Sequence, residues 1–362
     1  MTAVLLLTAV GLLMIYSATR THLALNDLSP TMKLGKQLVF VIIGLVLFVI
    51  IASFDYSRLA NLSWPLFIGS LVLLVAVLAI GTEVNGARRW IDFGSLRLQP
   101  GELAKPCLIL FLASYMAARA EQAGDFDLLL RTLGFAGIPC ALILIEPDLG
   151  TPVLLIFVWG IMCYALGSRL HHLAAIWFAF LMLFAAAWGF DVIRPHQRAR
   201  LMAFVNNNPQ TREEKDARYQ LEQSMIAIGS GHLAGQGLFR GPQTQLRFVP
   251  DQETDFIFTA IGEELGFLGA AAVVALLGVV LWRTLMIAMH ARTLFGRLIA
   301  AGVAGMFFLH ILANIGMTLG MTPVKGMPLP FVSYGGSALM ANFIALGVLQ
   351  SVFIDRQTIR FD

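Results

Sequence analysis

Long apolar runs recur along this chain and constrain its fold more than any other feature. An α-helix needs about 20 predominantly apolar residues, or slightly fewer, to cross the hydrocarbon core of a bilayer. We identify ten such runs, at roughly 2–18, 37–53, 64–81, 103–118, 132–146, 149–166, 171–190, 255–283, 297–321 and 333–354. Because backbone polar groups in hydrocarbon must be satisfied within their own segment, these runs predict helices rather than strands. The sequence therefore predicts an all-α polytopic membrane protein with about ten transmembrane helices.

The composition supports this class and excludes others. Of the residues, 58% are hydrophobic and 13% are charged, against roughly 25% charged in soluble domains. The formal net charge of +3 is too small to suggest nucleic acid as a partner. The first run has no basic flank and no small-residue cleavage site, so we expect a retained span rather than a signal peptide. The three cysteines fall inside predicted spans without metal-ligand spacing, which predicts buried, unreactive thiols.

Two features of the topology stay open at this level. Only the turn-forming segment Glu146–Gly150 separates the fifth and sixth runs, and their merger would give nine spans. Lys and Arg are distributed almost evenly between the short loops of the two sides, so the positive-inside rule does not decide the orientation.

One connection, 191–254, is far longer than the others, and a loop of that length is usually functional or disordered. Within it, apolar residues between Thr211 and Ile228 recur at helical spacing. They predict an amphipathic helix, either lying on the membrane surface or packed on the loop itself. Two further polar segments, 82–105 and 322–337, lie on the same side as this loop if the chain has ten spans. That coincidence indicates a functional site on one face of the membrane.

An acidic trio stands where the large loop enters the eighth predicted span: Asp251, Glu253 and Asp255. Carboxylates are costly at the mouth of a transmembrane helix, so their presence there favours a function. Asp255 can act as a general base, or it can be an ordinary helix N-cap. Asp251 and Glu253 are more simply solvated loop charges than ligands of a divalent cation such as Mg²⁺ or Mn²⁺.

Several cations are candidates for binding an anionic substrate. Lys105 follows Glu102 by three residues, so on a helix the two share a face and can pair. The arginine fork matches phosphate oxygens, although each arginine is otherwise a surface charge. The arginine candidates, with a weaker lysine, are Arg88, Arg89, Arg198, Arg200 and Lys325.

Other conspicuous polar residues are interpreted as structural or left open. Ser333 begins the tenth predicted span, and a substrate-contacting turn and a helix-packing start explain it equally well. Glu263 and Glu264 lie inside the eighth span, where structural pairing is the better interpretation. The glycines between Gly229 and Gly241 lack the pattern of a phosphate-binding loop and are better explained by turns and close backbone approach.

Four segments resemble the signature segments of the SEDS family, whose members include RodA and FtsW. They are NGARRWI (85–91), QPGELAK (99–105), QTQLRFVPDQETDFIFTAIGEELGF (243–267) and PLPFVSYGGS (328–337). The resemblance covers essentially the whole chain, and the short termini are more similar to the RodA type. Gly101 departs from the pattern, because the family usually has serine there. This departure puts fine substrate contacts in doubt rather than the reaction.

The resemblance implies a peptidoglycan glycosyltransferase that polymerises lipid II at the outer face of the bacterial cytoplasmic membrane during rod-shaped elongation. Asp255 matches the family's catalytic aspartate, and the motifs favour site roles for Glu102, Lys105 and Arg89. The resemblance assigns no cofactor, and a divalent cation, Mg²⁺ or Mn²⁺, stays open. The implied partners are lipid II, membrane lipids and a class B penicillin-binding protein acting as transpeptidase. A lipid II flippase is the alternative, which the absence of a convincing internal repeat disfavours.

Overall fold

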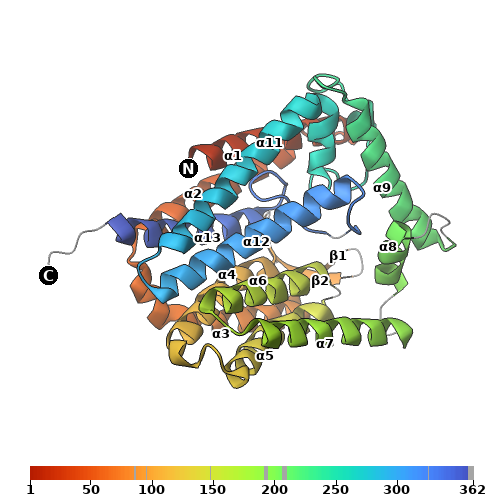
Figure 1. The fold of residues 1–362 in the computed structure, drawn as a ribbon. Helices are drawn as coiled ribbons and strands as arrows, with labels where there is room; N and C mark the ends of the chain where they lie inside the picture. The colour runs from red at the N-terminus through yellow and green to blue at the C-terminus, as the bar shows by residue number, and fades with distance from the viewer. Residues whose placement is uncertain are drawn as a thin grey trace. The chain divides into compact units, whose positions relative to one another are not determined.

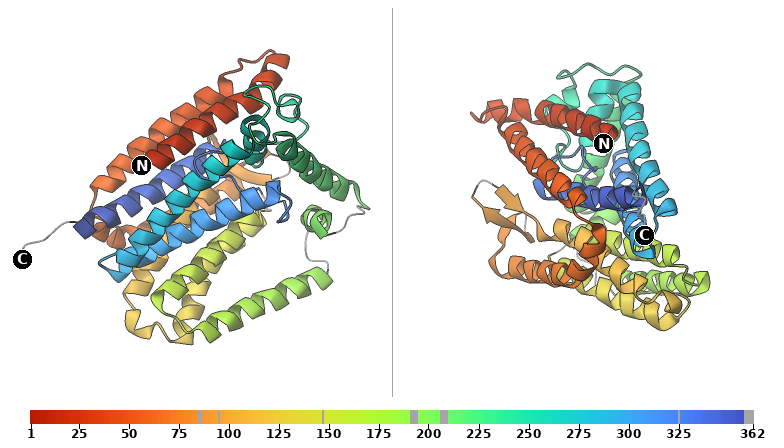
Figure 2. Two further views of the ribbon diagram at one scale, coloured as in Figure 1. Left: turned by 45° about the horizontal axis from the view of Figure 1, so that its top comes forward. Right: turned by 90° about the vertical axis from the view of Figure 1, so that its left-hand side faces the viewer.

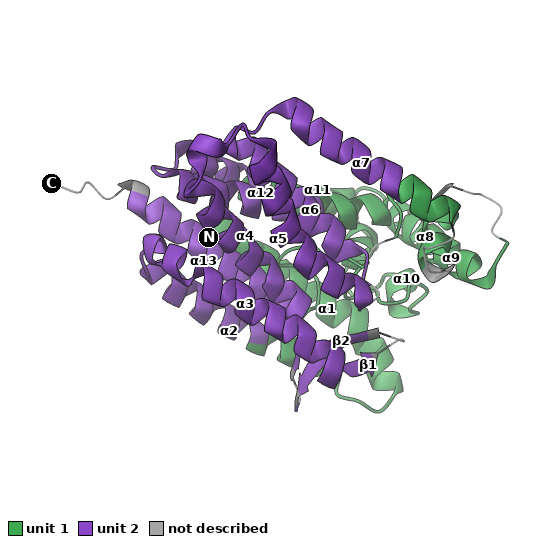
Figure 3. Ribbon diagram, turned by 90° about the horizontal axis from the view of Figure 1, so that it is seen from below, with its two compact units in different colours: residues 1–39, 184–280, 310–335 green, residues 40–183, 281–309, 336–362 purple. Residues whose placement is uncertain are grey.

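The computed structural model describes residues 1–84, 87–94, 96–146, 148–190, 195–205, 210–324 and 326–357, which are predominantly α-helical (Figure 1). The chain forms two compact units, each assembled from three stretches (Figure 3). Unit 1 comprises 1–39, 184–280 and 310–335, and unit 2 comprises 40–183, 281–309 and 336–362. Four of the five boundaries fall inside α2 (Met32–Ser53), α7 (Leu170–Gly189), α11 (Ile257–His290) and α12 (Leu294–Thr318), and the fifth is at the start of α13 (Gly336–Gln357). A single transmembrane domain over 1–362 stays a prediction.

Within the described ranges, eight helices are long and apolar enough to cross a membrane, which supports a multi-pass membrane protein. They are α1 (Thr2–Leu25), α2, α3 (Tyr56–Ile80), α5 (Phe126–Ile145), α7, α11, α12 and α13 (Gly336–Gln357). The other two predicted runs form α4 (Pro100–Ala117) and α6 (Gly150–Leu166). The fifth and sixth runs are therefore separate helices, while the count of ten spans stays a prediction.

Two predicted boundaries were wrong in ways that affect the site. The eighth run was expected to begin at Asp255, but α11 begins at Ile257, so Asp255 lies in the preceding turn. The tenth was expected to begin at Ser333, but α13 begins at Gly336. At the eighth run the apolar pattern extends past the helix, because the turn residue Phe256 is buried and as apolar as the helix that it precedes.

The core of unit 2 is built around α4, which packs against α3, α5, α6 and α13. Its middle turns, from Leu108 to Ala113, are almost completely buried. Gly302 of α12 belongs to the same core, because a Cβ there would come within 2.8 Å of Ile109 Cγ2. Gly305 likewise faces Ile161. These glycines therefore serve close helix packing within unit 2.

A small antiparallel sheet in unit 2 was not predicted. Strands β1 (Thr82–Val84), β2 (Ala87–Phe93) and β3 (Leu96–Leu98) pair in the order β1-β2-β3, and β2 contacts α3 and α4 (Figure 2). In β2, Ile91 is buried while Arg88 and Asp92 are exposed. This alternation is the period of a half-buried strand. The strands escaped prediction because they are short and carry many charges, like the rest of the polar 82–105 segment.

The large loop contains helices α8 (Pro195–Val205), α9 (Arg212–Ser230) and α10 (Pro242–Gln245), all in unit 1. Helix α9 confirms the predicted helix, and α8 packs beside it (Figures 1 and 2). A capping box fixes the start of α9: Thr211 Oγ1 accepts from the Glu214 N–H, and the Glu214 carboxylate accepts from the Thr211 N–H.

The packed face of α9 contacts protein. Its buried residues include Leu221 and Ser224. The Ser224 hydroxyl lies 2.7 Å from Thr259 Oγ1 of α11 and donates to the carbonyl of Thr318 at 2.9 Å. Both proposed placements of this helix, on lipid or on the loop alone, were therefore incomplete, since this face also packs on the ends of α11 and α12.

Helix α11 is broken at Gly266, whose φ of 67° and ψ of −167° are accessible almost only to glycine. The break frees backbone groups, and the glycine-rich segment of the large loop pairs with them. Phe267 N–H donates to the carbonyl of His232 at 2.9 Å, and Gln236 N–H donates to the carbonyl of Glu263 at 3.0 Å. These glycines thus provide turns and close backbone approach, as the sequence predicted.

Replacing Gly266 with alanine is expected to destabilise the protein by about 2–4 kcal/mol, because the backbone strain adds to an overlap of the new Cβ with Gly235 N. Gly278 in the same helix is the matched control, since a Cβ there meets nothing within 4 Å. Gly278→Ala is expected to stabilise by about 0.5–1 kcal/mol. Thermal unfolding in detergent measures both, and equal melting temperatures for the two variants would contradict this account of the break.

Candidate active site

Backbone contacts fix Asp255, and the residue as a whole is partly buried. Its N–H donates to the carbonyl of Asp251 at 3.1 Å, and its own carbonyl accepts from Asn314 Nδ2 at 2.8 Å. The next residue, Phe256, is buried in an apolar cluster with Val249, Met317 and Val324. Backbone contacts thus hold Asp255 at the entry to α11.

Asn314 of α12 joins the Asp255 turn to the segment that follows α12. The residue is fully buried, and its Nδ2 also donates to the carbonyl of Met327 at 2.7 Å. One turn earlier in α12, His310 Nδ1 lies 3.1 Å from the carbonyl of Pro328. One amide therefore sets the distance between Asp255 and the 326–328 segment.

Gly326 is the point at which this segment meets the candidate base. A Cβ at Gly326 would lie 3.2 Å from Asp255 Oδ2, closer than most Cβ contacts. Because Gly326 has no side chain, no Cβ at this position crowds the Asp255 carboxylate.

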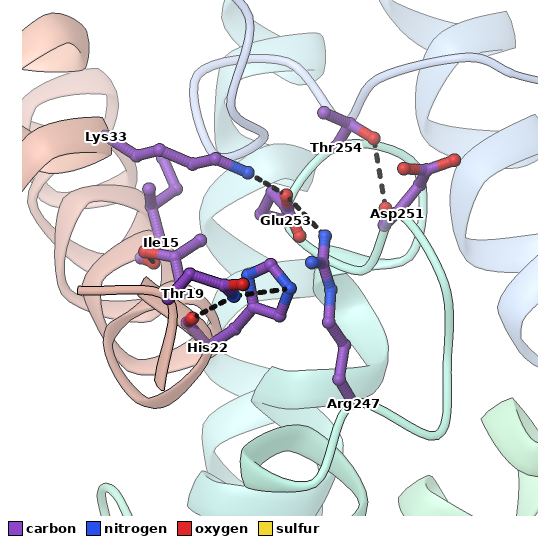
Figure 4. Close-up of polar contacts among 9 residues, drawn as sticks. Ile15, Thr19, His22, Lys33, Arg247, Asp251, Glu253 and Thr254 are labelled. Carbon is purple, nitrogen blue, oxygen red and sulfur yellow. Dashed lines mark hydrogen bonds and ion pairs between the residues drawn. The ribbon is translucent and has the colours of Figure 1, made fainter. Parts of the chain in front are cut away.

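Glu253, two residues before Asp255, is the centre of an ion cluster (Figure 4). Its Oε1 accepts hydrogen bonds from Lys33 Nζ and, at 3.2 Å, from Arg247 Nη2. Its backbone carbonyl accepts from the N–H of Tyr334 at 2.8 Å. Burial raises the pKa of Glu253, but the two cations outweigh burial and hold it below its ordinary value. Glu253 is therefore a buried, charged residue of the site and not the solvated loop charge that we expected.

Glu263 and Glu264 have the structural role that we predicted. Glu263 accepts from the backbone N–H groups of Gln243 and Thr244 at 2.8 and 2.9 Å, which cap α10. Glu264 accepts from the Ser17 hydroxyl at 2.7 Å and from Gln245 Nε2 at 3.0 Å. Both carboxylates tie the large loop to the transmembrane helices of unit 1.

Ser333 lies in a buried turn rather than at the start of α13. Its hydroxyl accepts from the Leu329 N–H at 2.8 Å, and its carbonyl accepts from Gln37 Nε2 at 3.2 Å. These contacts favour the packing interpretation of Ser333 over direct substrate contact.

In unit 2, the predicted pairing of Lys105 and Glu102 is confirmed. Lys105 Nζ lies 2.7 Å from Glu102 Oε1, and both residues are buried in the first turns of α4. The pair belongs to a different unit from Asp255. Its burial means that either group, if left alone, would be an uncompensated charge inside the protein.

The arginines of the 82–105 segment differ from each other. Arg88 pairs with Glu83 across the β1–β2 hairpin at 3.6 Å with both side chains exposed, a geometry that contributes little free energy. Arg89 Nε donates to the backbone carbonyl of Glu146 at 2.8 Å, just after α5. Burial raises the pKa of the Glu146 carboxyl to about 8, with a smaller contribution from Asp148, while Arg89 acts to lower it.

The remaining predicted cations lie elsewhere. Arg198 of α8 stacks on Trp188, with the guanidinium carbon 5.0 Å from the ring centroid, and Arg200 is exposed on the same helix. Lys325 lies outside the described residues. Cys140 and Cys163 are buried, Cys107 is half-buried, and all three are free thiols.

A metal site does not emerge from the described ranges, in which no group of three or more His, Cys, Asp or Glu side chains could hold an ion. Glu253, which we considered as a metal ligand, is instead paired with two cations.

Sequence reasoning missed four residues that surround Asp255 or Glu253: Lys33, Arg247, Asn314 and Gly326. Asn314 carried a usable signal, because a polar amide inside an apolar span usually marks a function or an internal contact. Lys33 carried little signal, since a lysine beside a span usually extends to the membrane interface.

Comparisons with known proteins bear on the whole chain. A family model for cell cycle proteins of the FtsW, RodA and SpoVE type matches residues 1–358. The peptidoglycan glycosyltransferase RodA of Treponema pallidum is 33% identical over 96% of this chain and 95% of its own length. The peptidoglycan glycosyltransferase MrdB of Escherichia coli K12 is 34% identical over 95% of this chain and 90% of its own.

Solved structures are similar over nearly the full length. The Rod shape determining protein RodA of Thermus thermophilus superposes with a TM-score of 0.71 at 30% identity, covering 99% of this chain and 96% of that one. A chain of a peptidoglycan synthase complex that coordinates polymerization and crosslinking superposes with a TM-score of 0.80 at 29% identity, covering 99% of both chains. The predicted all-α polytopic fold is thereby confirmed.

Glu146 predicts a dependence of stability on pH. Its folded-state pKa of about 8 lies above the ordinary 4.5, so the unfolded chain releases the proton first. The contribution of Glu146 to stability is therefore greatest below about pH 4.5 and falls as pH rises to about 8, by up to roughly 5 kcal/mol. Glu146→Gln mimics the protonated carboxyl, and its advantage over the parent in melting temperature should grow across this window. A constant difference from pH 5 to pH 8 would show that Glu146 ionises normally.

Proposed function

We propose, from the premise that this chain belongs to the FtsW/RodA/SpoVE family and is a glycosyltransferase, that it polymerises lipid II into peptidoglycan strands. Relatives that match along nearly their whole length carry the name peptidoglycan glycosyltransferase. The proposed substrate is a disaccharide-pentapeptide on undecaprenyl pyrophosphate, and the proposed setting is cell elongation.

The placement of Asp255 is the observation that carries the proposal. Asp255 is partly buried, Asn314 fixes its backbone, and a Cβ at Gly326 would crowd its carboxylate. In the proposed step, Asp255 takes the proton from the acceptor sugar hydroxyl as that oxygen attacks the donor's anomeric carbon. The bond from this carbon to the diphosphate oxygen breaks, and the lipid diphosphate leaves with the electron pair. Direct displacement inverts the anomeric centre.

In this scheme one base suffices, because a diphosphate leaves without protonation. This differs from glycoside hydrolysis, in which a second carboxylic acid protonates the leaving oxygen. Lys105, with Glu102, and Arg89 are proposed substrate-side residues of unit 2, supported by their motifs and by the burial of the Lys105–Glu102 pair.

The proposal includes a location and a partner. We place the protein in the bacterial cytoplasmic membrane with Asp255 facing outward, where sugar units would be joined. The proposed partner is a class B penicillin-binding protein that cross-links the new strands. The similarity to a chain of a complex that coordinates polymerization and crosslinking supports such a partner.

Replacing Asp255 with asparagine is expected to lower the rate of lipid II polymerisation at least about 100-fold, because the amide cannot accept the proton. Asp251→Asn is the matched control, since Asp251 is an exposed carboxylate of the same turn. Purified protein with labelled lipid II, with and without the partner, gives the rates. Equal rates for Asp255→Asn and the parent reject the base assignment. Lipid movement between leaflets without polymer formation by either protein supports a flippase.

Asn314→Leu is expected to lower kcat about 10- to 100-fold with a smaller change in KM, because it releases Asp255 from the 326–328 segment. Thr318→Val in the same helix is the control, since the Thr318 hydroxyl donates to the carbonyl of Ile315 within the helix. Steady-state kinetics and melting temperatures are compared for both. A large loss of melting temperature with an unchanged kcat in the folded fraction means that Asn314 does not position the base.

A further inference from the structure

Lys33 and Arg247 converge on one carboxylate from distant parts of unit 1 (Figure 4). Lys33 is at the start of α2, and Arg247 follows α10. Both donate to Oε1 of Glu253, whose side chain is only 4% exposed. The two cations are themselves partly accessible, with 24% and 28% of their side chains exposed.

The charges of this cluster do not balance. Two cations share one carboxylate, which leaves a formal charge of +1. An ammonium has three N–H donors and a guanidinium has five. Lys33 and Arg247 each donate one hydrogen bond to Glu253. Several charged donors therefore remain for another acceptor. By contrast, the Arg218–Glu222 pair of α9 matches one cation with one anion.

Burial explains how the cations are held. Glu253 is nearly inaccessible and Tyr334 fixes its backbone, so the carboxylate is a rigid anchor for both cations. Lys33 Nζ also lies 5.7 Å from the centre of the Tyr334 ring. Holding two like charges together costs free energy that an anion bound between them would recover.

We propose that Lys33 and Arg247 bind the diphosphate group of the lipid-linked donor, with Glu253 as the residue that positions them. This assignment rests on the proposed glycosyl transfer, and it adds binding residues for the leaving group. The cluster is two residues from Asp255 along the chain. Negative charge grows on the diphosphate as the anomeric bond breaks, and preorganised cations stabilise that charge best.

The number of donors favours a diphosphate over a single phosphate. Two cations with several free N–H groups can contact oxygens of both phosphate groups at once, and arginine adds a planar fork suited to them. A phospholipid headgroup offers the same oxygen chemistry through one phosphate. The experiment therefore has to separate these two sources.

Binding of inorganic pyrophosphate and of inorganic phosphate is measured calorimetrically on the full chain in phosphatidylcholine nanodiscs. Lys33→Gln and Arg247→Gln are each expected to weaken pyrophosphate binding about tenfold, the loss of one charge-assisted contact. Each variant leaves one cation on Glu253, so the fold is expected to persist, as melting temperatures check. The charge-matched controls Lys215→Gln and Arg218→Gln, both on α9, are expected to bind like the parent.

The proposal is overturned if the parent does not bind pyrophosphate, if the Lys33 and Arg247 variants bind it as the parent does, or if the α9 controls lose as much affinity. It is also overturned if phosphatidylglycerol in the nanodiscs, or inorganic phosphate, competes as well as pyrophosphate, which identifies a phospholipid site. Asp255→Asn is expected to bind pyrophosphate normally. If pyrophosphate binding depends on Lys33 and Arg247 but the protein forms no polymer, the proposed function is rejected and the anion site stands. If the protein forms polymer but both variants bind pyrophosphate as the parent does, the anion site is rejected and the proposed function stands.

Discussion

Polar groups that lie among apolar helices have no water to bind, so each must find its partner inside the protein. The break at Gly266 exists because residues 232–237 supply hydrogen bonds to the backbone that it frees. Glu263 and Glu264 are satisfied in the same way. The Glu263 carboxylate accepts hydrogen bonds from the N–H groups of Gln243 and Thr244, and the Glu264 carboxylate accepts one from the Ser17 hydroxyl. The same demand also makes the amide of Asn314 join the carbonyls of Asp255 and Met327. The local geometry of the candidate base thus follows from the satisfaction of buried backbone groups.

Charge at the site is governed by the same balance of burial and partners. Glu253 and Glu146 are both almost inaccessible, yet their pKa values move in opposite directions. Glu253 has two cations within reach and stays ionised. Glu146 has Asp148 nearby and only the opposing influence of Arg89, so burial dominates. A buried carboxylate two residues before Asp255 is therefore held as an anion, and it fixes two cations in place.

The features that depend on local sequence were predictable. Helical spans follow from the length of the apolar runs, and α9 follows from the spacing of Leu221 and its neighbours. Asp255 was chosen as the candidate base because its surrounding segment is long and distinctive, and its expected place at the helix start was off by two residues. The small sheet escaped because its strands are short and charged.

Pairings between distant segments could not be predicted. Lys33 and Glu253 are 220 residues apart, and Asn314 and Asp255 are 59 apart. Nothing in the local spacing of either residue indicates its partner, since a lone lysine beside a span has many possible contacts. Glu253 looked like a solvated charge because its sequence neighbours are polar, whereas the residues that bury it come from α2 and the 326–335 turn.

The central claim is that the carboxylate of Asp255 removes the proton from the attacking hydroxyl. The dependence of the polymerisation rate on pH tests it most directly. The account predicts that the rate of the parent falls in a single step as acid protonates this carboxylate, and that the residual rate of Asp255→Asn shows no such step. An identical acid limb in the parent and in Asp255→Asn would contradict it, because another group would then be accepting the proton.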